Sequence, residues 1–396
     1  MSNSPSSSSI PSPPSGPSLP ELPVELLRQI VEQSVPSYYH SSTYNDRQLT
    51  LRNLCLTSRL FRKLAQPLLE EFDQLSLTHV GADIEPDQER NKATRVLSVT
   101  VGSDRPLGST ESLVLNYPNL QSLHIYSERR LYYYINIPPF APLSSLTNLT
   151  ISCIDARLPI PATFPSLRYL TISRSNENEI APLLRPAVLP SLRILALLYA
   201  LPYSEPEIDF DALLSRLDLL IGTPCIFEYF EEDLAFMEKH GDKILMDVRY
   251  DEISDRTLPT AQHVRIRVTP GEMKAERSPY TEEERLDRWE EKEPWDLTEE
   301  PNSEGDLREA FNWFWDSRWA SEIPYKTLFL DHGLYDVLDS FEWLQDGYDH
   351  IVEMCEKDRT EVVLEEQPVS KSADSAITPE LLRWIDRRKE KAKVGK

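Results

Sequence analysis

The sequence is short of glycine and cysteine. Only 11 of its 396 residues are Gly, and none are arranged as a phosphate-binding loop or a dinucleotide fingerprint, so no nucleotide site is expected. The 4 cysteines contain no Cys-x-x-Cys pair, and the histidines contain no His-x-x-x-His. This spacing predicts neither a metal site nor a disulfide framework. We therefore expect no cofactor and reduced thiols, as in an intracellular protein.

Positive charge and long apolar runs are also scarce. Lys and Arg number 42 against 65 Asp and Glu, a net charge of -23, which disfavours binding to nucleic acid or to an anionic membrane. No stretch approaches ~18 uncharged apolar residues, and the first residues do not form a secretory signal. We expect a soluble protein of the cytoplasm, the nucleus or both.

Residues 1–18 are mostly Ser and Pro. Such a composition buries too little apolar surface to offset the entropy of ordering. We predict a disordered tail, followed by a helical unit over 19–72.

Two helical patterns follow the tail. Pro23 suits a first helical turn, and Leu26, Leu27, Ile30 and Val31 form an apolar stripe behind it. The second pattern has one apolar face at Leu51, Leu54, Phe61, Ala65 and Leu68, and another at Leu56, Leu60 and Leu64. A unit of this size buries only ~60% of its surface. One apolar face is therefore predicted to meet another domain or another protein.

These residues resemble the F-box, the helical module that binds the Skp-family adaptor of cullin-based ubiquitin ligases. The resemblance rests on the opening Leu-Pro and Glu-Leu-Leu of residues 22–27, and on Thr57 to Phe61 followed by Leu64 and Ala65. The family usually has a Val-like residue at the position of Thr57 and Trp at that of Phe61. The resemblance implies adaptor-binding side chains at Leu22, Pro23, Leu26, Ile30, Leu56 and Leu60.

A repeat begins after alternating, strand-like segments near residues 73–102. The segments YPNLQSLHI, LSSLTNLTI, FPSLRYLTI and LPSLRILAL share an apolar-x-x-Leu-x-x-Leu-x-apolar pattern. Their first leucines, Leu120, Leu146, Leu167 and Leu192, lie 26, 21 and 25 residues apart. That spacing lies in the range of roughly 20 to 29 residues that is typical of leucine-rich repeats.

The repeats resemble the irregular leucine-rich repeats that are joined to F-boxes in fungal-type F-box proteins. The resemblance implies an α/β fold: a helical F-box, then a leucine-rich-repeat-like solenoid over 73–360 with a mainly parallel sheet and a helical cap. We expect Leu123, Leu149, Leu170 and Leu195 to stack on adjacent strands. An accidental run of leucines is the alternative.

The remaining segments continue the helix and strand alternation. Residues 210–222 read as one helix with a glycine stop, 230–241 as another, and KILMDVRY, HVRIRV and YKTLFL as strands. Residues 272–306 form an acidic insertion, and 334–358 a capping helix. Residues 361–396 read as a linker and a short basic helix, which is either an ordinary charged tail or a nuclear import signal.

Together the two resemblances imply a non-catalytic, substrate-recruiting subunit of an SCF-type ubiquitin ligase, with an adaptor, a cullin bound through it and an unidentified target as partners. Side chains that alternate with the repeat leucines would face a target, whereas Ile194, Ala196 and Leu198 on the same face need a cover. A non-ligase repeat scaffold remains open, as does an enzyme with a site within 209–330, which a buried polar cluster would favour. The target-binding candidates are His124, Tyr126, Thr150, Tyr169 and Thr171.

Overall fold

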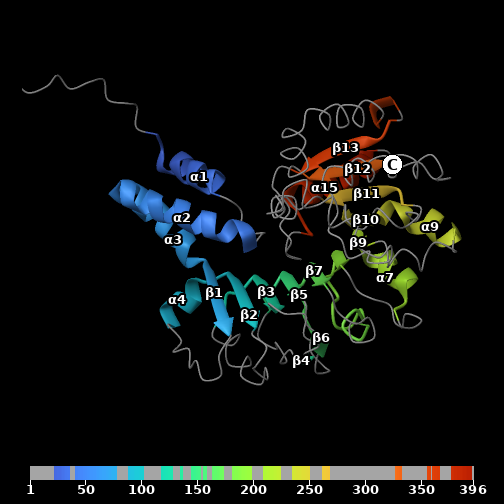
Figure 1. Cartoon of the computed structure of the whole chain (residues 1–396), viewed down its shortest axis with the longest axis horizontal. Helices are drawn as coiled ribbons and strands as arrows, with labels where there is room; N and C mark the ends of the chain where they lie inside the picture. Colours follow the sequence, from blue (N-terminus) through green and yellow to red (C-terminus); the bar gives the residue numbers. More distant parts are fainter. Residues whose placement is uncertain are drawn as a thin grey trace, which may run out of the picture.

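The computed structural model describes the chain in separate segments (Figure 1). They are residues 22–35, 41–77, 88–101, 117–127, 134–136, 144–152, 155–157, 163–173, 181–198, 208–223, 234–249, 261–267, 326–331, 355–357, 359–365 and 376–394. The predicted tail (1–18), the acidic insertion (272–306) and nearly all of the predicted capping helix (334–358) lie outside these residues.

Three helices form the N-terminal unit: α1 (Val24–Ser34), α2 (Ser41–Thr57) and α3 (Arg59–Glu70). Ser58 lies between α2 and α3 in extended conformation, and its hydroxyl accepts a hydrogen bond from the Phe61 backbone N–H. The Ser58 hydroxyl thus supplies an acceptor to a backbone N–H of the first turn of α3 that has no intrahelical acceptor. This N-cap marks the start of α3. The helices pack around a small core of Val31, Val35, Leu51, Ala65 and Leu68.

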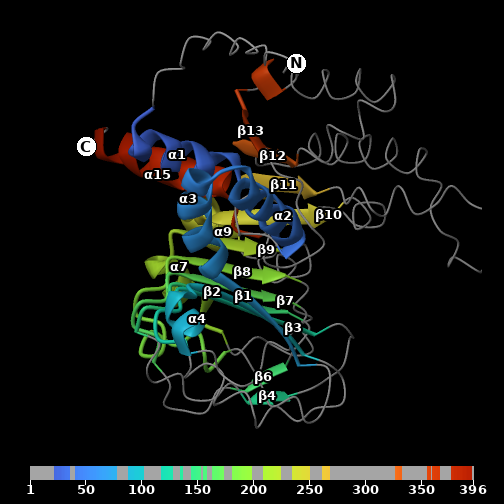
Figure 2. The same ribbon diagram turned by 90° about the vertical axis from the view of Figure 1, so that its left-hand side faces the viewer.

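An 11-stranded sheet follows, and its strands pair in parallel. Its order is β1-β2-β3-β5-β7-β8-β9-β10-β11-β12-β13. The strands are β1 (Phe72–Leu77), β2 (Val96–Val101), β3 (Ser122–Ser127), β5 (Asn148–Ser152), β7 (Tyr169–Ser173), β8 (Ile194–Leu198), β9 (Leu219–Gly222), β10 (Ile244–Arg249), β11 (His263–Arg267), β12 (Thr327–Asp331) and β13 (Glu361–Glu365). The short strands β4 (Tyr134–Asn136) and β6 (Asp155–Arg157) pair separately. Figure 2 shows β7 to β11 pointing the same way.

The remaining helices connect or cover these strands. They are α4 (Gln88–Ala93), α7 (Phe210–Arg216), α9 (Leu234–His240), the 3-10 turn η2 (Gly241–Lys243) and α15 (Pro379–Val394). In Figure 1 the sheet bends, with α7 and α9 on its outer side and α15 on its inner side. The two sides of the sheet are called the outer face and the inner face below.

The repeat leucines stack as the sequence predicts. The register joins Leu123 to Leu149, Leu149 to Leu170 and Leu170 to Leu195 on adjacent parallel strands, and all four side chains are buried. Leu97 extends this leucine row on one side and Leu220 on the other. The prediction of a stacked leucine row is confirmed, because side chains of the same register position share one face of the sheet.

The first half of the repeat pattern forms a turn before each strand. Backbone N–H groups of Leu120, Leu167 and Leu192 bond to the carbonyls three residues earlier, at distances between 3.3 and 3.4 Å. At the next step, one carbonyl of the preceding repeat accepts two successive N–H groups, as when Arg95 accepts from Gln121 and Ser122. The same pair of bonds recurs at the start of β5, β7, β8 and β9. Each repeat thus begins at the same height in the sheet.

Two predicted elements differ from the structure. The single helix predicted over 210–222 ends at Arg216, and residues 219–222 form β9. Leu217 is extended and buried, because the apolar run LLI of residues 219–221 pairs between β8 and β10 instead of continuing the helix. The sheet also continues to Glu365, so the first residues of the predicted linker form its last strand.

Candidate protein-binding surfaces

The N-terminal helices expose a set of large apolar side chains. Leu26 is 45% exposed and Ile30 48%, one turn apart on α1, whereas Val31 beside them is buried. Leu56 at the end of α2 is 76% exposed and Leu60 at the start of α3 is 41%. We use the name exposed helical face for the set of exposed apolar side chains of this unit: Leu22, Pro23, Val24, Leu26, Ile30, Leu49, Leu56 and Leu60. All six side chains predicted to bind the adaptor belong to it.

The exposure follows from how the unit packs. The face with Leu51, Ala65 and Leu68 supplies the internal core, with Leu54 and Phe61 packed against it. Leu56 and Leu60 point away from that core and stay in solvent, while Leu64 is half-buried. Isolated exposed leucines need no explanation, but a group of this size usually marks a contact site. The predicted surplus apolar face is therefore present.

Polar contacts hold the α2–α3 junction that carries Leu56 and Leu60. The Arg62 Nε donates to the Cys55 carbonyl at 3.1 Å, and the Thr57 hydroxyl donates to the Leu54 carbonyl at 2.8 Å. Together with the Ser58 cap, these bonds restrict the backbone at the junction. The exposed helical face is thus displayed on ordered backbone, which lowers the entropy cost of binding.

Three of the predicted target-binding residues form a row on the inner face, and two of these three are buried. The register places His124, Thr150 and Thr171 side by side on β3, β5 and β7. Thr150 is only 8% exposed and Thr171 3%. Side chains on the inner side of a bend converge, so short ones are shielded by their neighbours. The expectation of an open polar surface is wrong at these two threonines.

The two predicted tyrosines occupy other positions of that face. Tyr169 is half-buried and packs against an apolar cluster on the inner face. Tyr126 lies on β3 opposite Ser152 of β5. The structure therefore places the five predicted residues on one face, with Tyr169 at the border between its polar and apolar halves.

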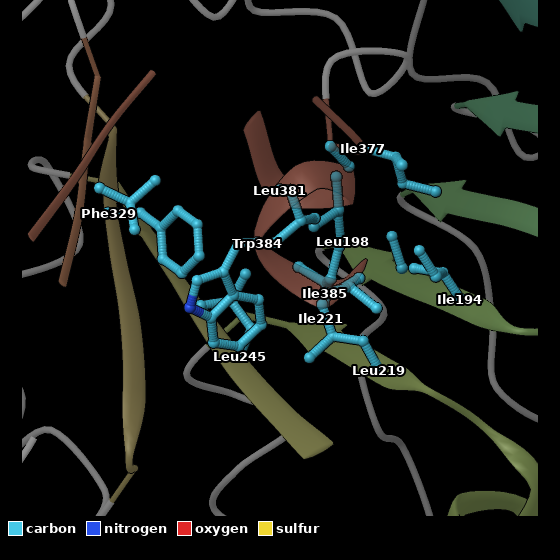
Figure 3. Packing of buried hydrophobic residues seen from close by; sticks show 13 residues of the cluster. Ile194, Leu198, Leu219, Ile221, Leu245, Phe329, Ile377, Leu381, Trp384 and Ile385 are labelled. Carbon is cyan, nitrogen blue, oxygen red and sulfur yellow. The ribbon is translucent and has the colours of Figure 1, made fainter. Parts of the chain in front are cut away.

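The apolar half of the inner face is covered by α15. Ile194, Ala196 and Leu198 are all buried, and Figure 3 shows Leu381, Trp384 and Ile385 of α15 packed over this part of the sheet. The cover predicted to be necessary is thus the C-terminal helix itself. We define the α15 seat as the inner-face residues beneath it: Ile194, Ala196, Leu198, Leu219, Ile221, Leu245, Phe329 and Val363.

The predicted C-terminal helix is docked on the sheet, which the interpretations as an ordinary charged tail or an import signal did not include. The signal that could have revealed it is the spacing of Leu381, Trp384 and Ile385, an i, i+3, i+4 apolar stripe. Trp384 is completely buried, between the rings of His263 at 5.0 Å and Phe329 at 5.2 Å. Burial lowers the pKa of His263 to about 3, so its ring is neutral at pH 7.

A buried ionic network meets the start of α15. Arg265, which has no exposed side-chain surface, donates to the Glu365 Oε1 at 2.7 Å and to the Ala376 carbonyl at 2.7 Å. The Thr378 hydroxyl donates to the same Glu365 oxygen at 2.5 Å and accepts from the Leu381 N–H at 3.2 Å. Asp247 lies 3.5 Å from Arg265. Thr378 is thus the N-cap of α15 and its link to the sheet.

This network is the buried polar cluster that would favour an enzyme with a site within 209–330. Its geometry favours a structural role instead. Arg265 and Glu365 are fully buried beneath α15, and their charges are neutralised by each other. Reacting atoms cannot reach groups that have no exposed surface. Within the described segments, no group of three or more His, Cys, Asp or Glu could hold a metal ion.

Acidic residues flank the α15 seat and pair with the basic end of the helix. The Lys389 Nζ lies 2.6 Å from the Asp218 carboxylate. Arg388 donates to the Asp242 carbonyl at 2.7 Å, and its guanidinium lies 4.5 Å from the centre of the Trp384 ring. Each partly exposed ion pair contributes little to stability. Together they fix the direction in which α15 crosses the sheet.

In the part of the chain that the structure describes, no helix has the length and apolar character needed to cross a membrane. No protein-family model and no curated protein sequence matches this chain. Function must therefore be argued from the surfaces themselves.

Proposed function

We propose that this chain is a substrate-recruiting subunit of an SCF-type cullin–RING ubiquitin ligase. In this proposal α1 to α3 are an F-box that binds a Skp-family adaptor. The sheet with its connections is a leucine-rich-repeat-like solenoid that carries the target. The chain itself contributes no catalytic residue to ubiquitin transfer.

One observation carries the proposal: the exposed helical face. Four of its five leucines, Leu22, Leu26, Leu56 and Leu60, are among the residues that the F-box resemblance assigns to the adaptor, and they stay in solvent although the same helices have an internal core. Burying one leucine on binding is worth about 1.5–3 kcal/mol. An apolar partner surface of matching shape would therefore gain substantially from covering Leu26, Ile30 and Leu56.

The departures from the F-box pattern are compatible with this role. Phe61, at the position where the family usually has Trp, packs half-buried against the helical core. Thr57 bonds to its own helix through its hydroxyl. Both residues act inside the unit, and neither interrupts the exposed leucines.

The repeated turns and the leucine row support the solenoid half of the proposal. Successive parallel strands with the same hydrogen bonds at each start are typical of a repeat architecture, in which each unit packs only on its neighbours. Such a solenoid holds its N-terminal and C-terminal ends apart. An adaptor held at α1 to α3 and a target held further along would be brought together, which raises the effective concentration of the target at the ligase.

Co-purification tests the proposal. The tagged chain expressed in its own cells should recover a Skp-family adaptor and a cullin, whereas the Leu22→Ala, Pro23→Ala double variant should lose both. Losing central anchors costs roughly 2 kcal/mol or more, about thirtyfold in affinity. Leu364→Ala is the matched control, because Leu364 is 55% exposed on β13, and it should recover both partners. Full recovery by the double variant would overturn the F-box assignment.

A non-ligase repeat scaffold is the second candidate, because an exposed apolar face also fits a different helical partner. The same experiment separates the two. Recovery of a protein by the wild type, lost in the double variant, without adaptor or cullin would favour the scaffold.

A further inference from the structure

The α15 seat and the leucine row are separate cores on opposite faces of the sheet. The cluster under α15 contains Ile194, Ala196 and Leu198 of β8, whereas Leu195 of the same strand belongs to the leucine row. The backbone hydrogen bonds between strands do not involve α15. The sheet therefore has its own apolar core and its own backbone hydrogen bonds. The helix α15 packs on this sheet in the way that an amphipathic helix binds an apolar groove of a partner protein.

The sheet supplies the charged groups that receive the start of the helix. Asp247, Arg265 and Glu365 all lie on strands, and the ion pair between Arg265 and Glu365 joins β11 to β13 without a side chain of α15. What α15 adds is one carbonyl, that of Ala376, and one hydroxyl, that of Thr378. Any helix whose N-cap is Ser or Thr can offer the same two groups.

The rest of the seat selects side chains by their position along the helix. Counted from the Thr378 cap, apolar contacts fall at cap+3, cap+6 and cap+7 (Leu381, Trp384 and Ile385). Trp384 fills the space between Phe329 and His263. The seat thus matches an amphipathic helix with an aromatic residue in its middle.

Polar and charged contacts hold the C-terminal half of α15. The groups at cap+10 and cap+11 are Arg388 and Lys389, and they meet the Asp242 carbonyl and the Asp218 carboxylate. These acceptors belong to the segments just before β10 and β9. In a chain with a net charge of -23, this edge attracts a basic helix end.

We propose that the α15 seat is the target-binding site of the chain and that α15 is its built-in competitor. The target contributes a helix with a Ser or Thr cap, an apolar residue at cap+3, an aromatic–aliphatic pair at cap+6 and cap+7, and basic residues near cap+10. This inference rests on the proposed function, since it names the class of target that the ligase recruits.

Tethering explains how such a competitor regulates binding. The segment joining β13 to Ala376 is only 366–375, and a short tether gives a bound group an effective concentration on the order of millimolar. A free helix of equal intrinsic affinity therefore loses to α15. A target displaces α15 only if it binds the seat more tightly or if α15 is weakened.

A peptide-binding experiment on the full chain tests the proposal. The variant Trp384→Ala, Ile385→Ala keeps the sheet but weakens α15 as a competitor. A fluorescent peptide with the native sequence of 376–394 should bind this variant at least tenfold more tightly than it binds the wild type. The same peptide carrying both alanines should not bind. A folded variant, with a cooperative melt and wild-type circular dichroism, that binds no native peptide would overturn the proposal.

Hydrogen exchange of the wild type keeps the test decisive if that variant does not fold. As a displaceable occupant, α15 should exchange its amides at least tenfold faster than β7, β8 and β9, through openings that leave the sheet intact. Exchange of α15 at the same rate as these strands would mean that the helix leaves only when the whole domain unfolds. That result would overturn the proposal.

Adaptor binding, measured on the same preparations, separates the two levels of inference. Failure of the peptide and exchange tests with adaptor binding intact would reject the α15 seat as the target site but leave the proposed function. If the wild type does not bind the adaptor, the ligase role is rejected. The identification of the helix that binds the α15 seat as part of a ligase target is then rejected as well.

Discussion

Replacing Glu365 with leucine should destabilise the protein strongly, because it isolates a buried cation. The Glu365 carboxylate has no exposed surface and accepts from both Arg265 and Thr378. Its removal leaves the Arg265 guanidinium buried, with the Ala376 carbonyl at 2.7 Å and Asp247 at 3.5 Å as remaining partners. Breaking a buried pair typically costs 3–5 kcal/mol. Since two partners remain, we expect about 3 kcal/mol.

A glutamate on the same strand provides the control. Glu361 is half-buried, and its pair with Arg387 spans 3.5 Å at the surface. Such pairs contribute ~0–1 kcal/mol, so Glu361→Leu should leave stability almost unchanged. Urea unfolding followed by circular dichroism measures both variants, provided that the slope with urea is unaltered. A loss below about 1 kcal/mol for Glu365→Leu, or equal losses for the two variants, would refute the argument that Glu365 neutralises a buried cation.

Three further predictions follow from the described contacts. The pKa of His263 is about 3 in the folded chain against roughly 6.5 in the unfolded chain. Between these values only the unfolded chain binds a proton at His263, so the free energy of unfolding should fall as the pH drops below about 6.5, by ~2 kcal/mol at pH 5. Urea midpoints at pH 7.5 and 5 measure this, and an equal pH slope in His263→Gln would contradict it. Leu170→Ala, in the middle of the leucine row, should cost about 2–5 kcal/mol, and Leu364→Ala, on an exposed side chain, less than about 0.5 kcal/mol; similar melting temperatures would argue against the row as a core. Ser58→Ala removes the α3 cap and should cost about 1 kcal/mol in the helical unit, seen as faster hydrogen exchange in α3, while unchanged exchange there would show that the cap contributes nothing.

The repeat strands could be predicted because their signal is local. Each leucine pattern contains the residues of the turn, the residues of the strand and the leucine that joins the leucine row. Leu123, Leu149 and Leu170 were therefore placed on the correct face of the sheet from the sequence alone. The exposed helical face was predictable for a similar reason: the helices around Leu51 and Leu56 have more apolar faces than one small core can use.

The place of α15 could not be predicted, because it depends on partners far away in sequence. Arg265 contacts Ala376 across 111 positions, and Arg388 contacts Asp242 across 146. The stripe at Leu381, Trp384 and Ile385 predicts an amphipathic helix, but not the surface that it covers. The division of 210–222 into α7 and β9 was missed because a short apolar run fits a buried helix and a buried strand equally well.

Binding of the purified full chain to a purified Skp-family adaptor tests the central claim most directly. Isothermal titration calorimetry should show a one-to-one complex for the wild type, and Leu26→Ala with Leu56→Ala should weaken it at least thirtyfold, since both side chains are exposed anchors. Leu364→Ala should bind as the wild type does. An absence of binding by the folded wild type, or equal affinity of the double variant, would contradict the assignment of α1 to α3 as an adaptor-binding F-box.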